Sequence, residues 1–326
     1  MLADWFGRRR LLVGGLAISA VGAFTCSTAN LIYLLILGIT LWGMGTGFFF
    51  MSCSVIVFDL FKSKVRGQAL GTFQAIVFIG SFIGAPIGSF MVHIAGYSGV
   101  FIVASVLIVC SFFVAYLSKG LKQLDIKNVN QKASLSLKEI LPGVKNWSLT
   151  SVYINSFTRM LIWMGITGTV VPLFLNLELG INVELISLVI SSRTGSMILA
   201  TAISGHMSDK AGRKPMIVLG MLMQACSLYA YTLAASFEVL VFIGLVEGFG
   251  CGMVLTSSMV LLSEIAPPKL RGGAIGIDRT FISVGGFFGP LFFMVIFYQL
   301  GAYFTFISAI SVIAVSIAFI LTIKAP

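Results

Sequence analysis

Charged residues are scarce in this sequence, and so are the residues from which most soluble active sites are built. Only 10% of the 326 residues are charged, whereas a soluble domain contains about 25%. Two histidines are present, and the five cysteines lie far apart in apolar stretches without a Cys-x-x-Cys pair. This composition argues against a disulfide framework and a metal site. It also offers no cluster of catalytic residues, so we expect neither an enzyme nor a cofactor.

Apolar residues, by contrast, make up 58% of the chain and occur in long runs. A helix needs about 20 apolar residues to cross a bilayer, and ten segments approach or exceed this length. They span residues 11–29, 31–58, 67–93, 99–118, 148–176, 181–204, 215–235, 237–262, 272–298 and 302–323. The sequence therefore predicts an all-α transmembrane protein in a lipid bilayer.

Most basic residues lie in the connections on one side of these predicted spans. That side contains 18 of the 21 lysines and arginines, whereas the opposite side contains none and has Glu178, Glu184 and Glu238. Basic loops usually face the cytoplasm, so we expect these connections and the C-terminus to be cytoplasmic in a cell membrane. The net charge of +10 then reflects membrane orientation, and we expect no nucleic-acid partner.

One connection, residues 119–147, is long and polar and contains six lysines. We expect it to be a cytoplasmic linker between two helical bundles. The N-terminal bundle would contain four spans within residues 1–118, and the C-terminal bundle six spans within residues 148–326.

An internal repeat relates these two bundles. A shift of 205 residues maps Arg66 onto Arg271, and ten of the 16 glycines in residues 1–120 map onto another glycine. Two homologous bundles in parallel orientation are typical of secondary transporters. Because the first bundle has two spans fewer than the second, we also expect about 60 further residues upstream of Met1, which would bring ten spans to twelve.

A loop motif occurs once in each half of the repeat. Residues 205–214 read Gly-x-x-x-Asp-x-x-Gly-Arg-Lys, and residues 1–10 contain a second copy. This resembles the signature loop of the major facilitator superfamily, which lies between spans two and three and between spans eight and nine. An acidic residue followed seven positions later by arginine, as in Asp59 and Arg66, resembles a second element of that superfamily.

The resemblance implies a cytoplasmic gate in which these loops form ion pairs that hold the two bundles closed. Its expected residues are Asp4, Gly7, Arg8, Asp59, Arg66, Asp209, Gly212, Arg213, Glu264 and Arg271. The alternative is a set of solvated surface pairs, each worth less than about 1 kcal/mol.

A glycine pattern points weakly to drug antiporters of the same superfamily. Gly285 and Gly289 followed by Pro290 resemble a pattern that these antiporters have in span five, but here it lies in span eleven. Span five has Ala85 before its proline, and Ile39 stands where the antiporters have an arginine in span four. The glycines also suit plain close packing of helices in a membrane.

Five charged residues lie inside apolar spans: Arg159, Arg193, Glu247, Asp278 and Arg279. Such charges are costly in lipid and usually face a cavity or a partner. The resemblance assigns them to spans seven, eight, ten and eleven, which line the central cavity of the superfamily, so we expect a substrate and proton pathway. Purely structural ion pairing is the alternative, for which Asp278 and Arg279 are the best candidates.

Within that pathway we expect Arg159 and Glu247 to face one another or a common cavity, because both lie close to mid-bilayer. Glu247 is the candidate proton carrier, since a carboxyl group is protonated more readily in a low-dielectric medium than in water. Three cations against two anions favour an anionic or zwitterionic substrate.

These observations predict a monomeric secondary transporter that moves a small molecule by alternating access. Its energy would come from an ion gradient, with a proton as the expected coupling ion, or from the substrate's own gradient. The rival interpretation is a non-transporting membrane sensor on the same fold. It would require a signalling region in addition to the two bundles.

Overall fold

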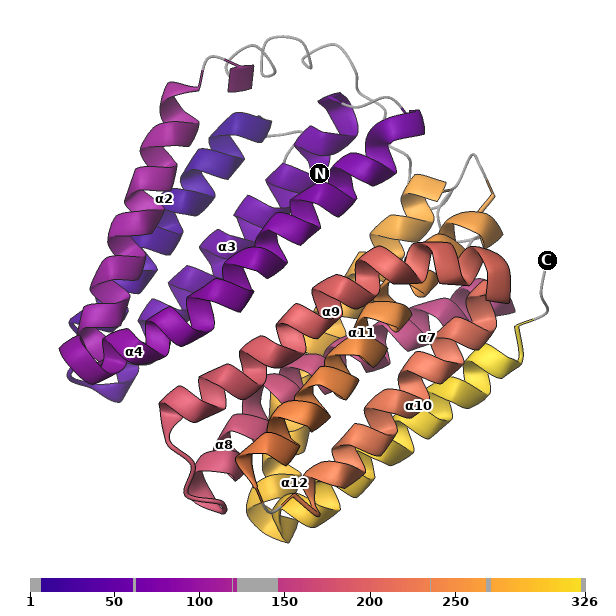
Figure 1. Cartoon of the computed structure of the whole chain (residues 1–326). Coiled ribbons are helices and arrows are strands. Elements are labelled where there is room, and N and C mark those ends of the chain that lie inside the picture. The colour runs from indigo at the N-terminus through magenta and orange to yellow at the C-terminus, as the bar shows by residue number, and fades with distance from the viewer. Residues whose placement is uncertain are drawn as a thin grey trace. The chain divides into compact units, whose positions relative to one another are not determined.

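The described part of the chain is helical and contains no strand, as the sequence predicts (Figure 1). The computed structural model describes residues 7–60, 63–118, 120–121, 146–234, 236–267 and 271–323, with backbone alone at residues 54, 58–59, 63–71 and 271–272. In chain order the helices are α2 (Arg8–Ser27), α3 (Ile32–Leu60), α4 (Ser63–Leu117), α7 (Trp147–Ile162), the π-helix η1 (Trp163–Val170), α8 (Val171–Leu177), α9 (Val183–Ala211), α10 (Arg213–Tyr231), α11 (Phe237–Ile265) and α12 (Arg271–Leu321).

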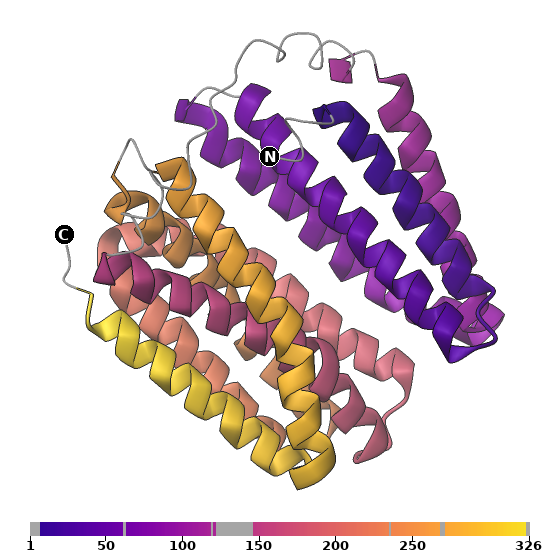
Figure 2. The ribbon, with the colours of Figure 1, turned by 180° about the vertical axis from the view of Figure 1, so that it is seen from behind.

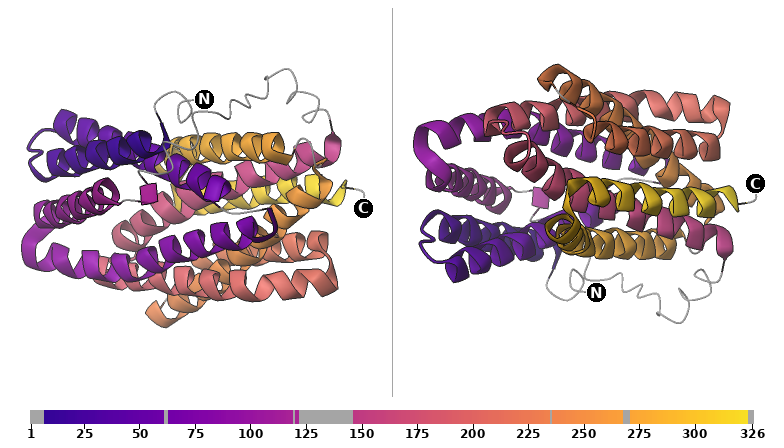
Figure 3. Two further views of the ribbon diagram at one scale, coloured as in Figure 1. Left: turned by 90° about the horizontal axis from the view of Figure 1, so that it is seen from above. Right: turned by 90° about the horizontal axis from the view of Figure 1, so that it is seen from below.

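Seven helical stretches among these residues are long and apolar enough to cross a membrane. Two of these stretches lie in α4 and α12, and each covers two of the predicted spans. A non-helical glycine interrupts each of these two helices and separates the spans. The chain turns back on itself within α4 (Figure 3) and within α12 (Figures 1 and 2). Together with α10, which packs against α9, α11 and α12, the helices account for all ten predicted segments.

The breaks in α4 and α12 are 205 residues apart, which is the shift of the sequence repeat. Gly96 has φ 67° and ψ 179°, and Gly301 has φ 81° and ψ 176°. A positive φ of this kind is readily adopted only by glycine. Gly7 and Gly212, which precede α2 and α10, form a second matching pair with φ 83° and 88°. The repeat in the sequence is therefore also a repeat of backbone conformation.

Contacts divide the chain into two compact units. The first unit contains α2, α3 and most of α4, and the second contains α7 to α12 together with Phe78–Pro86. The linker expected at residues 119–147 falls almost entirely outside the described residues, so the predicted domain boundaries stay a prediction.

Close glycine contacts hold neighbouring helices together in both units. A methyl group at Gly15 of α2 would lie 2.8 Å from the carbonyl oxygen of Gly45 in α3. At the matching position in the second unit, a methyl group at Gly220 of α10 would lie 2.6 Å from the carbonyl oxygen of Gly250 in α11. Small residues thus allow the backbones to approach each other closely, as expected for helix packing in a membrane.

Candidate functional site

A buried ion pair lies in the interior of the second unit. The Nε atom of Arg193 on α9 lies 3.0 Å from Oε1 of Glu247 on α11, and the two side chains are only 4% and 1% exposed. Both residues were expected in a substrate and proton pathway because they are charges inside apolar spans. The structure shows how each charge is balanced in this conformation.

A glycine next to Glu247 explains why these two side chains meet. Gly248 of α11 lies against the backbone carbonyl of Arg193, so closely that a methyl group at this position would overlap it. One turn further along, a methyl group at Gly252 would lie 2.6 Å from the carbonyl oxygen of Met197 on α9. The two helices are therefore in backbone contact at the level of the ion pair, and this contact aligns Arg193 with Glu247.

Two hydroxyl groups complete the bonding of the Glu247 carboxylate. Thr167 of η1 donates a hydrogen bond of 2.7 Å to Oε1, and Tyr231 at the end of α10 donates one of 3.4 Å to Oε2. Four helical segments thus converge on one carboxylate. The Arg193 guanidinium also lies 5.2 Å from the centre of the Trp163 ring, at which distance a cation–π interaction is favourable.

Thr167 and Trp163 belong to the π-helix, which interrupts a span that the sequence predicts as continuous. Inside it, Thr169 Oγ1 donates to the carbonyl oxygen of Met164, five residues earlier, at 2.8 Å. Pro172 is the second residue after this π-helix and lacks the amide hydrogen that an α-helix would bond to the carbonyl four residues earlier. Such π-helical turns are rare and frequently occur at functional sites. Here the wider turn holds two side chains against the Arg193–Glu247 pair.

Glu247 forms its ion pair with Arg193 and not with Arg159. That Arg159 and Glu247 face a common cavity stays a prediction. Sequence position indicated depth in the membrane for both arginines, but not which face of its helix each side chain occupies. Arg159 on α7 is also buried, at 9% exposure, and its Nε has no hydrogen-bond partner among the described residues. Its helix packs against α12, which carries Asp278 and Arg279. Asp278 is half-buried and Arg279 is exposed.

The signature loop at the other end of α10 forms a separate ionic cluster. Arg213 pairs with Asp209 at 2.5 Å and with Glu264 at 3.2 Å, and it donates a hydrogen bond to the hydroxyl of Ser208. Gly212 has the positive φ that joins α9 to α10. These contacts lie within the second unit, and the gating role expected of its loop residues stays a prediction.

Several other residues of the expected gate cannot be compared with the structure. Asp4 and the side chains of Asp59, Arg66 and Arg271 lie outside the described residues. Gly7 precedes α2 with a positive φ, and Arg8 begins that helix and is half-buried. A gate that closes the two bundles against each other stays a prediction.

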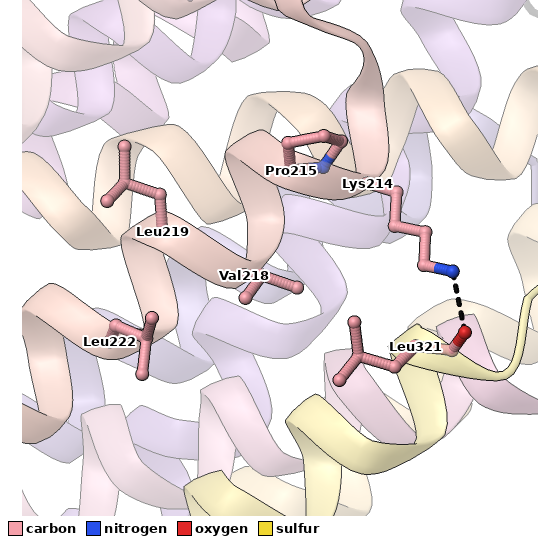
Figure 4. Close-up of a pocket in the computed structure, with 6 residues that line it drawn as sticks. All are labelled: Lys214, Pro215, Val218, Leu219, Leu222 and Leu321. Carbon is pink, nitrogen blue, oxygen red and sulfur yellow. Dashed lines mark hydrogen bonds between the residues drawn. The ribbon is translucent and has the colours of Figure 1, made fainter.

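A surface pocket of about 360 Å³ lies near the signature loop (Figure 4). It is lined by Lys214, Pro215, Val218, Leu219, Leu222 and Leu321. The ammonium group of Lys214 donates hydrogen bonds to the carbonyl oxygens of Leu321 and Ile323, which lie at the end of α12. Lys214 and Tyr231 are 17 residues apart on α10, or about 25 Å along a helix. This pocket is therefore separate from the Arg193–Glu247 site.

Comparison with known families accounts for both halves of the chain. The Major Facilitator Superfamily matches residues 1–164 and again residues 152–326. The chain belongs to this superfamily. It is a multi-pass membrane protein of a family of transporters, which are generally not enzymes, and the predicted all-helical fold is confirmed.

Similar proteins include a bacterial multidrug transporter and two bacterial drug-resistance proteins. The multidrug transporter protein MdtP of Bacillus subtilis is 26% identical over 88% of this chain, and the chain covers 63% of its length. Multidrug resistance protein 2 of the same organism is 21% identical over 88% of this chain and 72% of its own length. The quinolone resistance protein NorA of Staphylococcus aureus is 25% identical over 43% of this chain and 36% of its own length. The superfamily assignment thus agrees with the resemblance of the signature loops.

Sequence reasoning missed the uncharged members of the site. Thr167, Tyr231 and Trp163 are ordinary residues of apolar helices, and neither a motif nor a charge distinguishes them. A signal exists only for Pro172, which marks a place where a membrane helix departs from regular bonding.

Proposed function

We propose that this chain acts in a secondary active transporter that moves small organic molecules across the membrane by alternating access, driven by protons. The similarity to proteins named as a multidrug transporter and as a multidrug resistance protein supports organic substrates. We further propose a monomer in the cell membrane with its basic loops and C-terminus in the cytoplasm, since basic loops usually face that side.

The buried Arg193–Glu247 pair is the observation that carries the proposal. Protonation of Glu247 would leave the Arg193 charge without its partner and would remove the strongest acceptor for Thr167. An unbalanced arginine in the centre of a membrane span costs at least about 2.5 kcal/mol on insertion scales. The protein would then favour a different arrangement in which Arg193 reaches water or an anionic group. Proton binding would in this way bias the conformation of four helical segments at once.

The charges also support an anionic or zwitterionic substrate. Five charged residues lie within the spans of the second unit, three of them cations, and one cation remains after the two acids are balanced. A negatively charged group on the substrate would balance that remaining charge.

Flux into proteoliposomes tests the proposal. The compounds are norfloxacin, a zwitterionic quinolone suggested by the name of one relative, and ethidium, a permanent cation. We expect the full-length protein to accumulate at least one of them under a pH gradient. Glu247→Gln should abolish this gradient-driven accumulation but retain exchange of substrate between the two sides. The matched control Lys210→Met, which removes an exposed charge at the end of α9, should keep both activities. Unchanged gradient-driven uptake by Glu247→Gln would contradict proton coupling at this residue.

The sensor interpretation stays as the second candidate because of one similarity. The monosaccharide-sensing protein 1 of Arabidopsis thaliana is 30% identical over 39% of this chain, but over only 17% of its own length. A sensor would bind a small molecule without moving it. Saturable binding of a monosaccharide to the purified protein, together with no flux of any tested solute in the same proteoliposomes, would favour this candidate over a transporter.

A further inference from the structure

The three arginines inside the second unit differ in how their charges are balanced. Arg193 is paired with Glu247, and Arg279 is exposed. Arg159 is 9% exposed, yet its Nε has no hydrogen-bond partner among the described residues. An arginine placed in this way is costly unless another group binds it.

Two other polar groups with unused bonding capacity lie on α7, the helix of Arg159, and on α12, which packs against it. The hydroxyl of Tyr153 and Oδ1 of Asp278 are both buried without a hydrogen-bond partner in the described part of the chain. Tyr153 and Arg159 lie on α7 and Asp278 lies on α12, and these two helices pack against each other. The Tyr153 ring stacks on Phe281 at 5.6 Å between ring centres. These side chains come from α7 and α12, with donors on one helix and the acceptor on the other.

The packing of α7 against α12 fixes this arrangement. Gly285 of α12 lies against the carbonyl of Phe157, and a methyl group at Gly289 would lie 2.5 Å from the carbonyl oxygen of Leu161. Side chains on a helix lean toward its N-terminus, so Arg159 leans from this contact region toward Tyr153 and Asp278. The cluster is therefore positioned by backbone contacts and does not need the ligand to form.

Charge balance indicates what would bind there. The Arg193–Glu247 pair is neutral, whereas Arg159, Asp278 and Arg279 together have a charge of +1. A water molecule could fill the unused hydrogen bonds but would leave this charge in place. A carboxylate would satisfy the unused hydrogen bonds and would also neutralise the charge, because it is an anion that accepts two parallel hydrogen bonds from a guanidinium.

We propose that Arg159 is the subsite that binds the carboxylate group of an organic substrate. The proposal rests on the transport function above and narrows its substrates to carboxylates. The Tyr153 hydroxyl supplies a second donor, and the free oxygen of Asp278 receives a cationic or hydrogen-bond-donating group on the same molecule. The preferred substrate class is therefore a zwitterion or a carboxylic acid with a nearby donor.

Equilibrium dialysis with the purified full-length protein tests this subsite. The probes are salicylate and norfloxacin, each compared with its methyl ester, which lacks the negative charge. We expect each acid to bind about 10-fold or more tightly than its ester. Arg159→Met should remove this difference, Arg159→Lys should retain part of it, and the control Lys210→Met should retain all of it. Equal affinity for acid and ester in the unmodified protein, or an unchanged preference in Arg159→Met, overturns the proposal.

A second variant keeps the test decisive if Arg159→Met fails to give a folded protein by gel filtration. Asp278→Asn removes a negative charge from the helix packed against α7. Benzoate, which has no donor group for Asp278 to accept from, should therefore bind several-fold more tightly; no gain, or a loss, overturns the proposal. Dialysis measures binding without a proton gradient, so it tests the carboxylate subsite separately from the proposed proton-driven transport. Carboxylate binding without flux would count against transport alone, whereas proton-driven flux with no preference for acids over esters would count against this subsite alone.

Discussion

Replacing Glu247 by glutamine removes the charge that balances Arg193 but keeps a side chain of nearly the same size. Loss of one partner from a buried ion pair typically costs about 3–5 kcal/mol, because the other charge stays buried. The glutamine carbonyl could still accept the hydrogen bond that Thr167 donates to Oε1 at 2.7 Å. We therefore expect the lower end of this range, about 3 kcal/mol of unfolding free energy.

The double variant separates a charge effect from a packing effect. Arg193→Met alone would leave the carboxylate with its two hydroxyl donors, Thr167 and Tyr231, and should also cost about 3 kcal/mol. When both charges are removed, no unbalanced charge remains, so the double variant should be much more stable than the sum of the single losses predicts. We expect a coupling energy of about 2–3 kcal/mol.

Reversible unfolding in mixed micelles of mild detergent and sodium dodecyl sulfate measures these energies, with the change in tryptophan fluorescence as the signal. Lys210→Met is the control for a charge removed at the surface and should be within about 0.5 kcal/mol of the parent. The stability losses of the two single variants could instead add up to the loss of the double variant within about 0.5 kcal/mol. That result would show that Arg193 and Glu247 do not stabilise each other, and the basis for proton coupling would be lost.

Three further predictions concern glycines and the signature loop. Gly248→Ala would force its methyl group into the Arg193 carbonyl. We therefore expect the free energy of unfolding in the same assay to fall by about 1–3 kcal/mol. An unchanged value would show that the helices can separate without cost. Gly301→Ala should cost about 1–2 kcal/mol of unfolding free energy because of its φ of 81°. Gly276→Ala adds a methyl group with nothing within 4 Å, so it should be neutral or slightly stabilising. Equal effects of the two substitutions would contradict the strain argument. Asp209→Asn leaves Arg213 with Glu264 as an acidic partner and should change stability by less than about 1 kcal/mol. It should nevertheless increase the labelling of introduced cysteines from the cytoplasmic side, and unchanged labelling would count against the gate.

The helices and their breaks could be predicted from the sequence because their signals are local. Apolar length identifies a span, and the glycines that recur after 205 residues identify corresponding turns such as Gly96 and Gly301. The charged members of the site were equally visible, since a charge inside an apolar run is conspicuous.

The pairing of those charges could not be predicted. It depends on the rotation and tilt of α9 and α11, which are set by contacts such as Gly248 against the Arg193 backbone. Arg159 and Arg193 have similar depth and the same chemistry, so the sequence alone offered no reason to prefer one of them as the partner of Glu247. The π-helix was also missed, because its residues are as apolar as those of a regular span.

The repeat preserves the framework of the two halves but not their chemistry. Gly15 and Gly45 make the same contact as Gly220 and Gly250, whereas the positions that match Glu247, Asp278 and Arg279 are occupied by Trp42, Phe73 and Gln74. After a duplication, selection on packing would act on both copies, and selection on polar function would act on one. Random mutagenesis should therefore find inactivating substitutions at glycines in pairs 205 residues apart, and an inactivating loss of charge at Glu247, whose matching position is the uncharged Trp42.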